Sequence, residues 1–264
     1  MTSEKSRRFN LTFRPANELR DWRPIVEFYF ANERKHLPPP TADQIYNACE
    51  DGFFYVVHES TEPTDFLACA GTLVSARGTN SKHSDPNKDT QVYELTGALV
   101  RKLGGTSPNT IHEILVWLRT VGVMVLNGFG PSPSCFISSV IDANADSIAT
   151  LDRCRLQRMT LLPHWLEVES RSWVSGANAH HYYVPFGAFQ NHANALYNLV
   201  KNKTELTRRN KSDGVLETYS LIFEIPWLID GFAALEAIVT GKGDSSVAQI
   251  VEPPKYCRTK GGLL

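Results

Sequence analysis

The chain has 264 residues, a formal net charge of −1 at pH 7 and 42% hydrophobic residues. This length suffices for a full hydrophobic core, either as one large domain or as one domain with an appendage. A net charge near zero gives no reason to expect nucleic acid or a membrane surface as a partner, and we predict neither. No apolar run in the sequence approaches the roughly 20 residues of a membrane span.

The first ten residues and the cysteines predict a cellular location. Residues 1–10 are polar and basic with no apolar stretch, so we expect a disordered start and no secretory signal. The five cysteines are an odd number and include no Cys-x-x-Cys pair, which is typical of free thiols in a reducing compartment. We therefore predict a cytoplasmic protein, in which Cys69 and Cys135 are buried within apolar strands.

Apolar spacing and chain breakers predict the elements of the first half. Three prolines after Leu37 end the first helix, Thr41 caps the second, and Pro63 lies in a polar turn that joins the next two strands as a hairpin. The predicted elements are a strand at 11–15, helices at 22–36 and 42–50, strands at 53–58 and 66–75, an exposed loop at 77–90 and a strand at 91–100.

The helix at 108–126 has the strongest sequence pattern in the chain. Ser107 is a good N-cap, Pro108 suits the first helical position, and an apolar stripe runs from Ile111 to Val125. The elements predicted after it are a strand at 135–141, a helix at 145–154, a stretch rich in aromatic residues and histidine, a helix at 186–201, a strand at 215–225 and a helix at 227–240.

This order predicts the fold class and the domain organisation. Strands and helices alternate after residue 91, which indicates an α/β (α+β) protein with a mixed, mainly antiparallel central sheet flanked by helices. We assign residues 11–185 to the main domain, 186–242 to a C-terminal helix–strand–helix extension and 243–264 to an extended tail.

The junction at residues 93–108 has the composition of a phosphate-binding turn. A strand runs into Gly104 and Gly105 and then directly into a helix, so backbone N–H groups and the positive end of the helix converge on one point. Arg101 and Lys102 could add charge to such a cradle. The alternative is a tight strand-to-helix turn that binds nothing.

Two motifs in this order of elements resemble the GNAT-type N-acetyltransferase superfamily, over about residues 11–162. The superfamily's turn, Gln/Arg-x-x-Gly-x-Gly/Ala, is matched at Arg101 and Gly104, with Thr106 in the last position. The superfamily also often has Asn-x-x-Ala or Asn-x-x-Ser at the start of the helix after the next strand. Asn144 and Ser147 match that pattern.

The resemblance implies an acyl-CoA-dependent N-acyltransferase, which moves an acetyl or other acyl group to an amine by direct attack on the thioester. Acetyl-CoA or another acyl-CoA would be the co-substrate, with its pantetheine arm along the strand at 91–100. The acceptor would be a small-molecule or peptide amine. The residues implied in cofactor binding are Leu99, Val100, Arg101, Gly104, Gly105, Thr106 and Asn144.

Glu94 is the residue that we expect to remove a proton from the attacking amine. It lies on the strand that leads into the turn, where a partly buried carboxylate can act as a base, and the superfamily often has a Glu on this strand. The alternative is an outward-facing strand Glu. Two features depart from the superfamily: almost no spacer separates strand from turn, and Leu151 falls where a Tyr commonly protonates the departing thiolate.

The aromatic and histidine-rich stretch supplies the other catalytic candidates. His180, His181, Tyr182 and Tyr183 could each act in place of the missing acid, and we select Tyr183. We predict no metal site, because neighbouring histidines on a strand point apart and no carboxylate or Cys completes a ligand set. Cys154 has no histidine near it in sequence, so we interpret it as structural.

Two other functions remain open at this stage. A catalytically silent GNAT-like module for ligand binding or assembly would agree with Leu151 and Thr106, and residues 186–240 could then form a partner or homodimer surface. The same residues could equally form a lid or substrate wall in an enzyme. A weaker third option keeps the fold and cofactor but changes the reaction, for example to acyl transfer to a non-amine or to thioester decarboxylation.

Overall fold

The computed structural model describes residues 6–32, 40–59, 63–75, 91–96, 98–101, 109–127, 134–159, 179–202, 205–209, 214–240 and 250. Its strands are β1 (Ser6–Pro15), β2 (Phe54–Glu59), β3 (Phe66–Ser75), β4 (Gln91–Leu95), β5 (Leu99–Val100), β6 (Ser134–Ile141), β7 (Gln157–Arg158), β8 (Ala179–Tyr183), β9 (Glu205–Arg209) and β10 (Leu216–Phe223). Its helices are α1 (Trp22–Ala31), α2 (Ala42–Glu50), α3 (Asn109–Leu126), α4 (Ala145–Arg153), α6 (Phe186–Asn202), α7 (Pro226–Asp230) and α8 (Phe232–Thr240).

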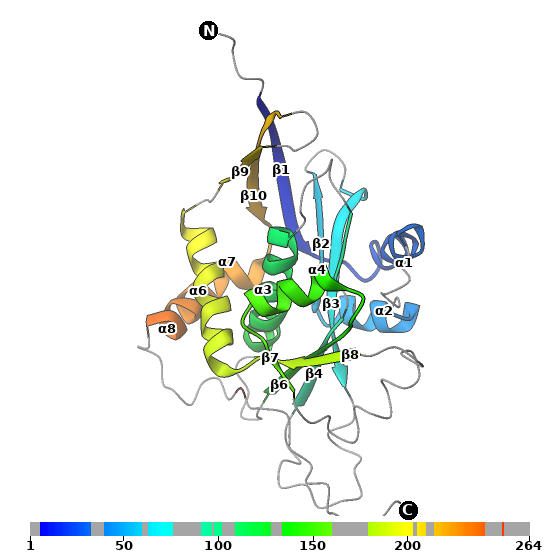
Figure 1. Ribbon diagram of the computed structural model, residues 1–264, viewed down its shortest axis with the longest axis vertical. Helices are drawn as coiled ribbons and strands as arrows, with labels where there is room; N and C mark the ends of the chain where they lie inside the picture. Colours follow the sequence, from blue (N-terminus) through cyan, green and yellow to red (C-terminus); the bar gives the residue numbers. More distant parts are fainter. Residues whose placement is uncertain are drawn as a thin grey trace, which may run out of the picture.

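The strands form one twisted sheet with helices on both faces (Figure 1). Their order is β7-β8-β6-β4-β3-β2-β1-β10-β9, and β5 pairs with β3. The β1–β10 and β4–β6 pairs are parallel and the other pairs are antiparallel. The predicted mixed, mainly antiparallel sheet is therefore confirmed.

Two large apolar cores cover the two faces of the sheet, and a third, small cluster contains Val92, Cys135 and Ile137. The smaller core joins α1 and α2 to one face through residues such as Ile25, Ile45 and Phe54. The larger core joins α3, α4, α6, α7 and α8 to the other face. Because side chains alternate along a strand, neighbouring residues of β4, β6 and β8 belong to different faces.

Several predicted boundaries were wrong. The strand predicted from residue 11 begins at Ser6, because residues 6–10 pair with β10, so residues 6–10 are not disordered. The helix predicted to residue 36 ends at Ala31. The helix predicted at 227–240 is divided into α7 and α8 at Gly231, whose N–H bonds the Trp227 carbonyl oxygen at 2.8 Å and closes α7. The short strands β7 and β9 were not predicted.

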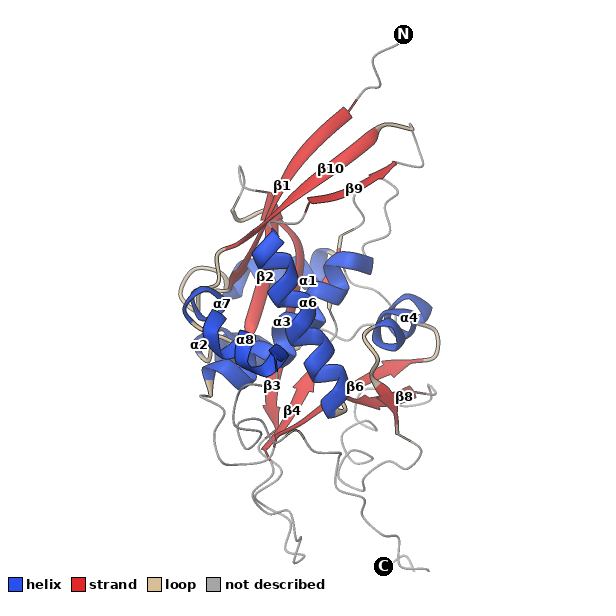
Figure 2. Ribbon diagram, turned by 90° about the vertical axis from the view of Figure 1, so that its left-hand side faces the viewer, coloured by secondary structure: helices blue, strands red, loops and turns tan. Residues whose placement is uncertain are grey.

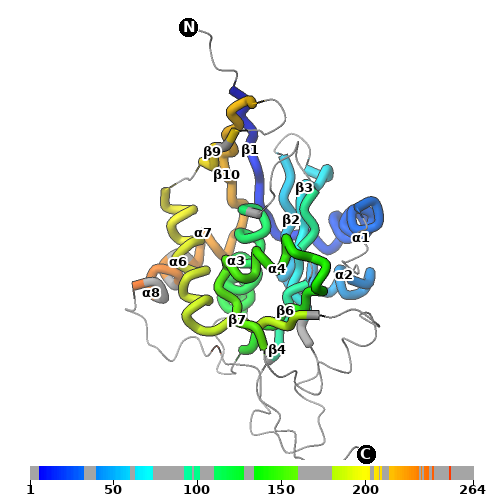
Figure 3. The backbone as a smooth tube through the Cα atoms, viewed as in Figure 1, coloured from blue at the N-terminus to red at the C-terminus, as the bar shows by residue number. Residues whose placement is uncertain are grey.

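The C-terminal extension shares the sheet and the core of the preceding residues. Strand β10 lies beside β1, and with β9 they form a ribbon that projects from the body (Figure 2). Helix α6 contacts α8 and α3, and α3 in turn contacts β2 and β3. Helix α3 therefore lies between the sheet and α6 (Figure 3). Gly122 of α3 allows this helix to pack closely on Tyr55 of β2, because a Cβ at Gly122 would lie 2.2 Å from the Tyr55 hydroxyl oxygen.

His192 is a buried histidine that joins α6 to α3 and to the end of α4. Its Nε2 lies 2.8 Å from the Cys154 carbonyl oxygen, and its Nδ1 lies 2.9 Å from Thr120 Oγ1. Because a carbonyl oxygen only accepts, Nε2 carries the proton and Nδ1 accepts from the threonine hydroxyl. Burial lowers the pKa of His192 to about 4, although the hydrogen bond to the Cys154 carbonyl opposes the shift.

This histidine should make the protein less stable in acid. The unfolded chain protonates near the ordinary pKa of 6.5 and the folded chain only near 4, so the stability present above pH 6.5 is lost as the pH falls through this window. The expected loss is about 1.4 kcal/mol per pH unit, or about 3 kcal/mol in all. Urea unfolding across the window measures it. His192→Gln cannot titrate, so it should remove this part of the pH dependence of the free energy of unfolding. An equal pH dependence in both proteins would contradict the assignment.

Candidate functional site

The strand predicted at 91–100 is interrupted by a β-bulge. Strand β4 pairs with β3 up to Leu95 opposite Thr72, and β5 resumes with Leu99 opposite Cys69. Between these two pairs β3 has two residues, Ala70 and Gly71, whereas the other strand has three positions, so the two registers differ by one residue, as at a β-bulge. Bulges bend the strand and often lie beside active sites.

The sheet separates beyond this bulge. The parallel ladder between β4 and β6 ends at Glu94 opposite Ile137, whereas β6 continues to Ile141 in pairing with β8. Among the strands that the structure describes, β5 pairs only with β3. Beyond the end of the β4–β6 ladder, β5 and the second half of β6 are therefore not paired with each other among the described residues.

Glu94 and Tyr183 lie in one cross-strand row at this point. Glu94 is opposite Ile137 of β6, and Ile137 is opposite Tyr183 of β8. Residues opposite one another share a face, and two strand spacings separate Glu94 from Tyr183 by roughly 10 Å at the backbone. Leu73, which lies opposite Glu94 on β3, packs against the core that contains α1 and α2. Both predicted catalytic residues therefore belong to that face.

The next row on the same face pairs a histidine with a serine. His181 is opposite Ser139, and its Nδ1 lies 2.8 Å from Ser139 Oγ. Burial, with His180 as a smaller cause, lowers the pKa of His181, so this imidazole is neutral at neutral pH. Tyr183 donates its hydroxyl proton to Gln157 of β7 at 2.5 Å.

The other two candidates from this stretch belong to the opposite face. Tyr182 is fully buried in the larger core, where its hydroxyl accepts from Arg158 Nε at 3.0 Å. His180 Nε2 pairs with Asp142 Oδ1 at 2.6 Å. The structure thus brings Tyr183 and His181, but not Tyr182 and His180, to the face of Glu94.

Arg119 extends from α3, which packs in the larger core, to the backbone of the bulge. Its Nη1 donates to the Thr96 carbonyl oxygen at 2.5 Å and to the Gly71 carbonyl oxygen at 3.3 Å. Thr96 is itself fixed to Gly71, since its N–H and its hydroxyl both donate to the Gly71 carbonyl oxygen, at 3.1 and 2.9 Å. The bulge is therefore held by a buried guanidinium rather than by strand pairing alone.

The predicted cofactor residues fall into three groups. Leu99 and Val100 form β5 and are buried, one against each core. Arg101 makes a two-bond ion pair with Asp65, at 2.8 and 3.1 Å, and its N–H bonds the Leu67 carbonyl oxygen. Asn144 caps α4, where its Oδ1 accepts from the Ser147 N–H at 3.2 Å. Gly104, Gly105 and Thr106 lie outside the described residues.

Leu151 and Cys154 lie in the apolar core beneath α4. Leu151 is 2% exposed and packs against α3 and the sheet, so it offers no proton at this position. Burial raises the pKa of the Cys154 thiol to about 12, which excludes a ready thiolate nucleophile there. Cys69 and Cys135 are buried, as predicted.

Sequence reasoning missed Arg119, Ser139 and Gln157. Arg119 had a detectable signal, since it is the one charged residue in the apolar run from Ile114 to Leu126. Ser139 and Gln157 had none, because only the register of β6, β7 and β8 brings them beside His181 and Tyr183.

The described residues contain no group of three or more His, Cys, Asp or Glu side chains that could hold a metal ion. None of the described helices is long and apolar enough to cross a membrane.

Comparison with known proteins finds similarity of fold. No family model matches the chain, and no curated protein matches it in sequence. A chain of the NatC complex bound to Gag peptide and CoA is similar over 67% of this chain and 98% of its own length, with 10% identity and a TM-score of 0.47. For Arabidopsis thaliana NAA60 in complex with acetyl-CoA these values are 66%, 98%, 12% and 0.44.

A third similar structure is an antibiotic-modifying enzyme. Aminoglycoside acetyltransferase AAC(6')-Ib, in complex with coenzyme A and kanamycin, is similar over 69% of this chain and 98% of its own, with 15% identity and a TM-score of 0.40. Other similar structures are named as acetyltransferases of the GNAT family, the superfamily that the sequence resembles. With TM-scores below 0.5, these three likenesses assign no role to any residue of this chain.

Proposed function

We propose that the chain is an acyl-CoA-dependent N-acyltransferase whose reaction takes place where the β4–β6 ladder ends. The observation that carries this proposal is the position of Glu94 at the last rung of that ladder, next to the bulge between β4 and β5. We expect the pantetheine arm, an extended, amide-containing chain, to run along this part of the sheet.

The residues on the two faces support different roles. The acceptor amine would approach on the face of α1 and α2, where Glu94 can take its proton directly or through a water. Tyr183, held by Gln157, and His181, held by Ser139, would line the same side and orient the acceptor. The acceptor would be a small-molecule or peptide amine, the two classes found in the structures with kanamycin and with Gag peptide.

The phosphate end of the co-substrate would lie at the turn after β5. Arg101 is the last described residue before that turn, and Asp65 fixes its guanidinium. Gly104, Gly105 and Thr106 remain predicted contacts of the pyrophosphate, and Asn144 of the pantetheine arm. A catalytically silent binding module is the second candidate, and the burial of Leu151 in the core favours it.

Ligand-induced stabilisation tests the proposal. CoA or acetyl-CoA at a hundredfold excess over its dissociation constant should stabilise the protein by about 2.7 kcal/mol, which raises Tm by roughly 5 to 10 °C. Gly105→Leu should abolish the shift by filling the predicted cradle. Gly187→Leu is the matched control, because a Cβ at Gly187 meets nothing within 4 Å.

The outcomes separate the two candidate functions. No shift with either ligand in the unmodified protein would rule out the acyl-CoA site. A shift without release of CoA in the presence of a panel of amines, small molecules and peptides, would support the silent module instead. If Gly105→Leu and Gly187→Leu lost the CoA-induced Tm shift equally, the loss would not be specific to residue 105. The predicted phosphate turn would then no longer be assigned to the CoA site.

A further inference from the structure

Strand β9 lies at one edge of the sheet. It pairs with β10 over its whole length, from Glu205 opposite Ser220 to Arg209 opposite Leu216. It is the last strand in the order of the sheet, so no strand among the described residues pairs with its other side. It is also the outer strand of the ribbon that projects from the body (Figure 2). Such an edge offers a row of backbone N–H and C=O groups to another chain.

The side chains of β9 belong alternately to two faces of the ribbon. Leu206 lies opposite Tyr219 and packs against the larger core. Glu205, Thr207 and Arg209 belong to the other face, and all three are exposed. Charged residues on an edge strand usually oppose association. Here the two charges have opposite signs and lie on either side of Thr207, so the strand is complementary to a second copy of itself.

Symmetry restricts how two copies of β9 can pair. Two identical antiparallel edge strands are related by a twofold axis normal to the sheet, which keeps each side chain on its own face. Residues opposite one another also share a face, so only residues an even number of positions apart can be opposed. Among these registers, the one centred on Thr207 places Glu205 of each copy opposite Arg209 of the other. The same pair then occurs twice, as a self-complementary interface requires.

We propose that β9 pairs with β9 of a second copy of this chain, antiparallel and centred on Thr207, so that the sheet continues across a homodimer. Backbone hydrogen bonds between the two strands and one Glu205–Arg209 pair at each end hold the copies together. Opposite charges directly across a strand pair stabilise it, and like charges destabilise it. Because the shared ladder is short, we expect a Kd in roughly the micromolar range.

Charge reversal at either end of β9 tests the interface. Sedimentation of the full chain at roughly 1 to 500 μM measures the association. Glu205→Arg opposes two positive charges at both ends of the ladder, and Arg209→Glu opposes two negative charges. Each variant should raise Kd at least about tenfold. Arg8→Glu is the matched control, because Arg8 is an exposed residue on the same face but on β1, two strands from the edge; it should leave Kd unchanged.

A mixture of the two charge-reversed variants separates this interface from a general loss of folding. When Glu205→Arg pairs with Arg209→Glu, the two introduced charges face each other with opposite signs, and the two native residues still pair at the other end. An equimolar mixture should therefore regain the association that each variant alone has lost. The double variant, which exchanges both charges within one chain, should regain it as well.

Each outcome decides the inference. An unmodified protein that stays monomeric over the whole concentration range overturns it. A dimer that neither reversal at β9 weakens, or that Arg8→Glu weakens equally, forms through another surface and also overturns it. Loss of association in both single variants without recovery in their mixture shows that residues 205 and 209 do not face each other, which overturns it too. CoA binding does not enter the measurement, so the proposed function is tested separately.

Discussion

Replacement of Glu94 by Gln is expected to lower kcat by roughly 100- to 10,000-fold, the usual contribution of a general base. The amide has the shape of the carboxylate but cannot take a proton from the amine. Acyl-CoA affinity should stay unchanged, because Glu94 would act on the acceptor amine and not on the acyl-CoA. Release of free CoA measures kcat, and thermal shift measures binding.

The pH dependence and two comparison variants sharpen this test. The loss in Glu94→Gln should shrink as the pH rises, because more of the amine is then already neutral. Glu59→Gln makes the same change on a strand away from the bulge and should have no effect on turnover. Tyr183→Phe should raise the KM for the acceptor while kcat stays close to the unmodified value. Unchanged turnover in Glu94→Gln would remove Glu94 from the mechanism.

Local periodicity predicted most of the elements, but not the face of Glu94. The apolar stripe of α3 is a property of a short segment, which a sequence displays directly. Alternation also implies that Tyr182 and Tyr183 face opposite ways. It does not say which of the two faces Glu94, because that depends on pairing between β6 and β8.

Features that depend on distant pairing could not be predicted. The bulge at 96–98 exists because β3 pairs with both β4 and β5 in registers that differ by one residue. The parallel pairing of β1 with β10 joins segments more than 200 residues apart. The hydrogen bonds of Arg119 to the bulge also depend on distant pairing, since only the folded sheet brings the Gly71 and Thr96 carbonyl oxygens to its side chain.

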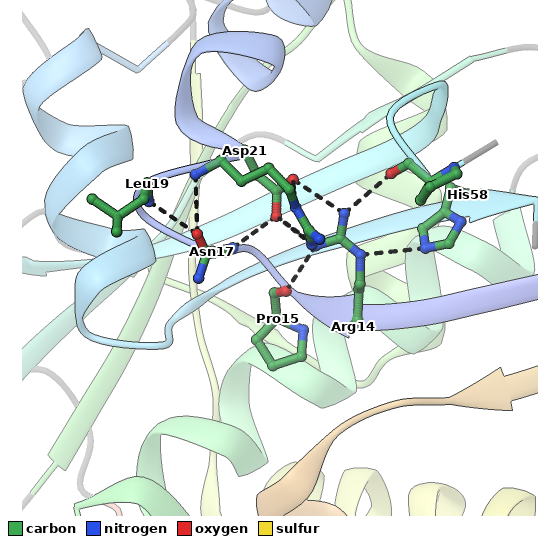
Figure 4. Close-up of polar contacts among 8 residues, drawn as sticks. Arg14, Pro15, Asn17, Leu19, Asp21 and His58 are labelled. Carbon is green, nitrogen blue, oxygen red and sulfur yellow. Dashed lines mark hydrogen bonds and ion pairs between the residues drawn. The ribbon is translucent and has the colours of Figure 1, made fainter.

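A second large effect is expected from a buried polar cluster at the end of β1 (Figure 4). Arg14 makes two bonds to the Asp21 carboxylate, from Nη1 at 2.5 Å and from Nη2 at 3.1 Å. Its Nε donates to His58 Nε2 at 3.3 Å, and Nη2 also donates to the Pro63 carbonyl oxygen at 3.1 Å. Asp21 stands at the N-cap position of α1, but its carboxylate faces Arg14 rather than the helix.

The charge state of Asp21 is set by competing effects. Burial alone would raise the pKa of its carboxyl, but hydrogen bonds from Arg14, Arg20 and the Asn17 N–H outweigh burial and hold the pKa below its ordinary value of 3.8. A carboxylate with a lowered pKa stabilises the folded state at pH values above its ordinary pKa of 3.8. Its contribution is lost only as the pH falls through the lower, folded-state pKa.

Asp21→Asn should lower the free energy of unfolding by about 3 to 5 kcal/mol, because it leaves the buried Arg14 charge uncompensated. Urea unfolding at neutral pH measures the change. The double variant Arg14→Met with Asp21→Leu should recover most of the loss, since an apolar pair of similar volume needs no counter-charge. A single variant that is no less stable than the unmodified protein would contradict the assignment.

The cluster also connects stability to the proposed site. Arg14 bonds the Pro63 carbonyl in the turn between β2 and β3, and two residues later Asp65 holds Arg101 at the end of β5. A loosened turn would free Arg101, the residue that leads into the predicted phosphate turn. Asp21→Asn should therefore weaken CoA binding at temperatures where the protein is still folded. Arg20→Gln is the control, because it removes only the half-exposed partner of Asp21 and should leave CoA affinity unchanged.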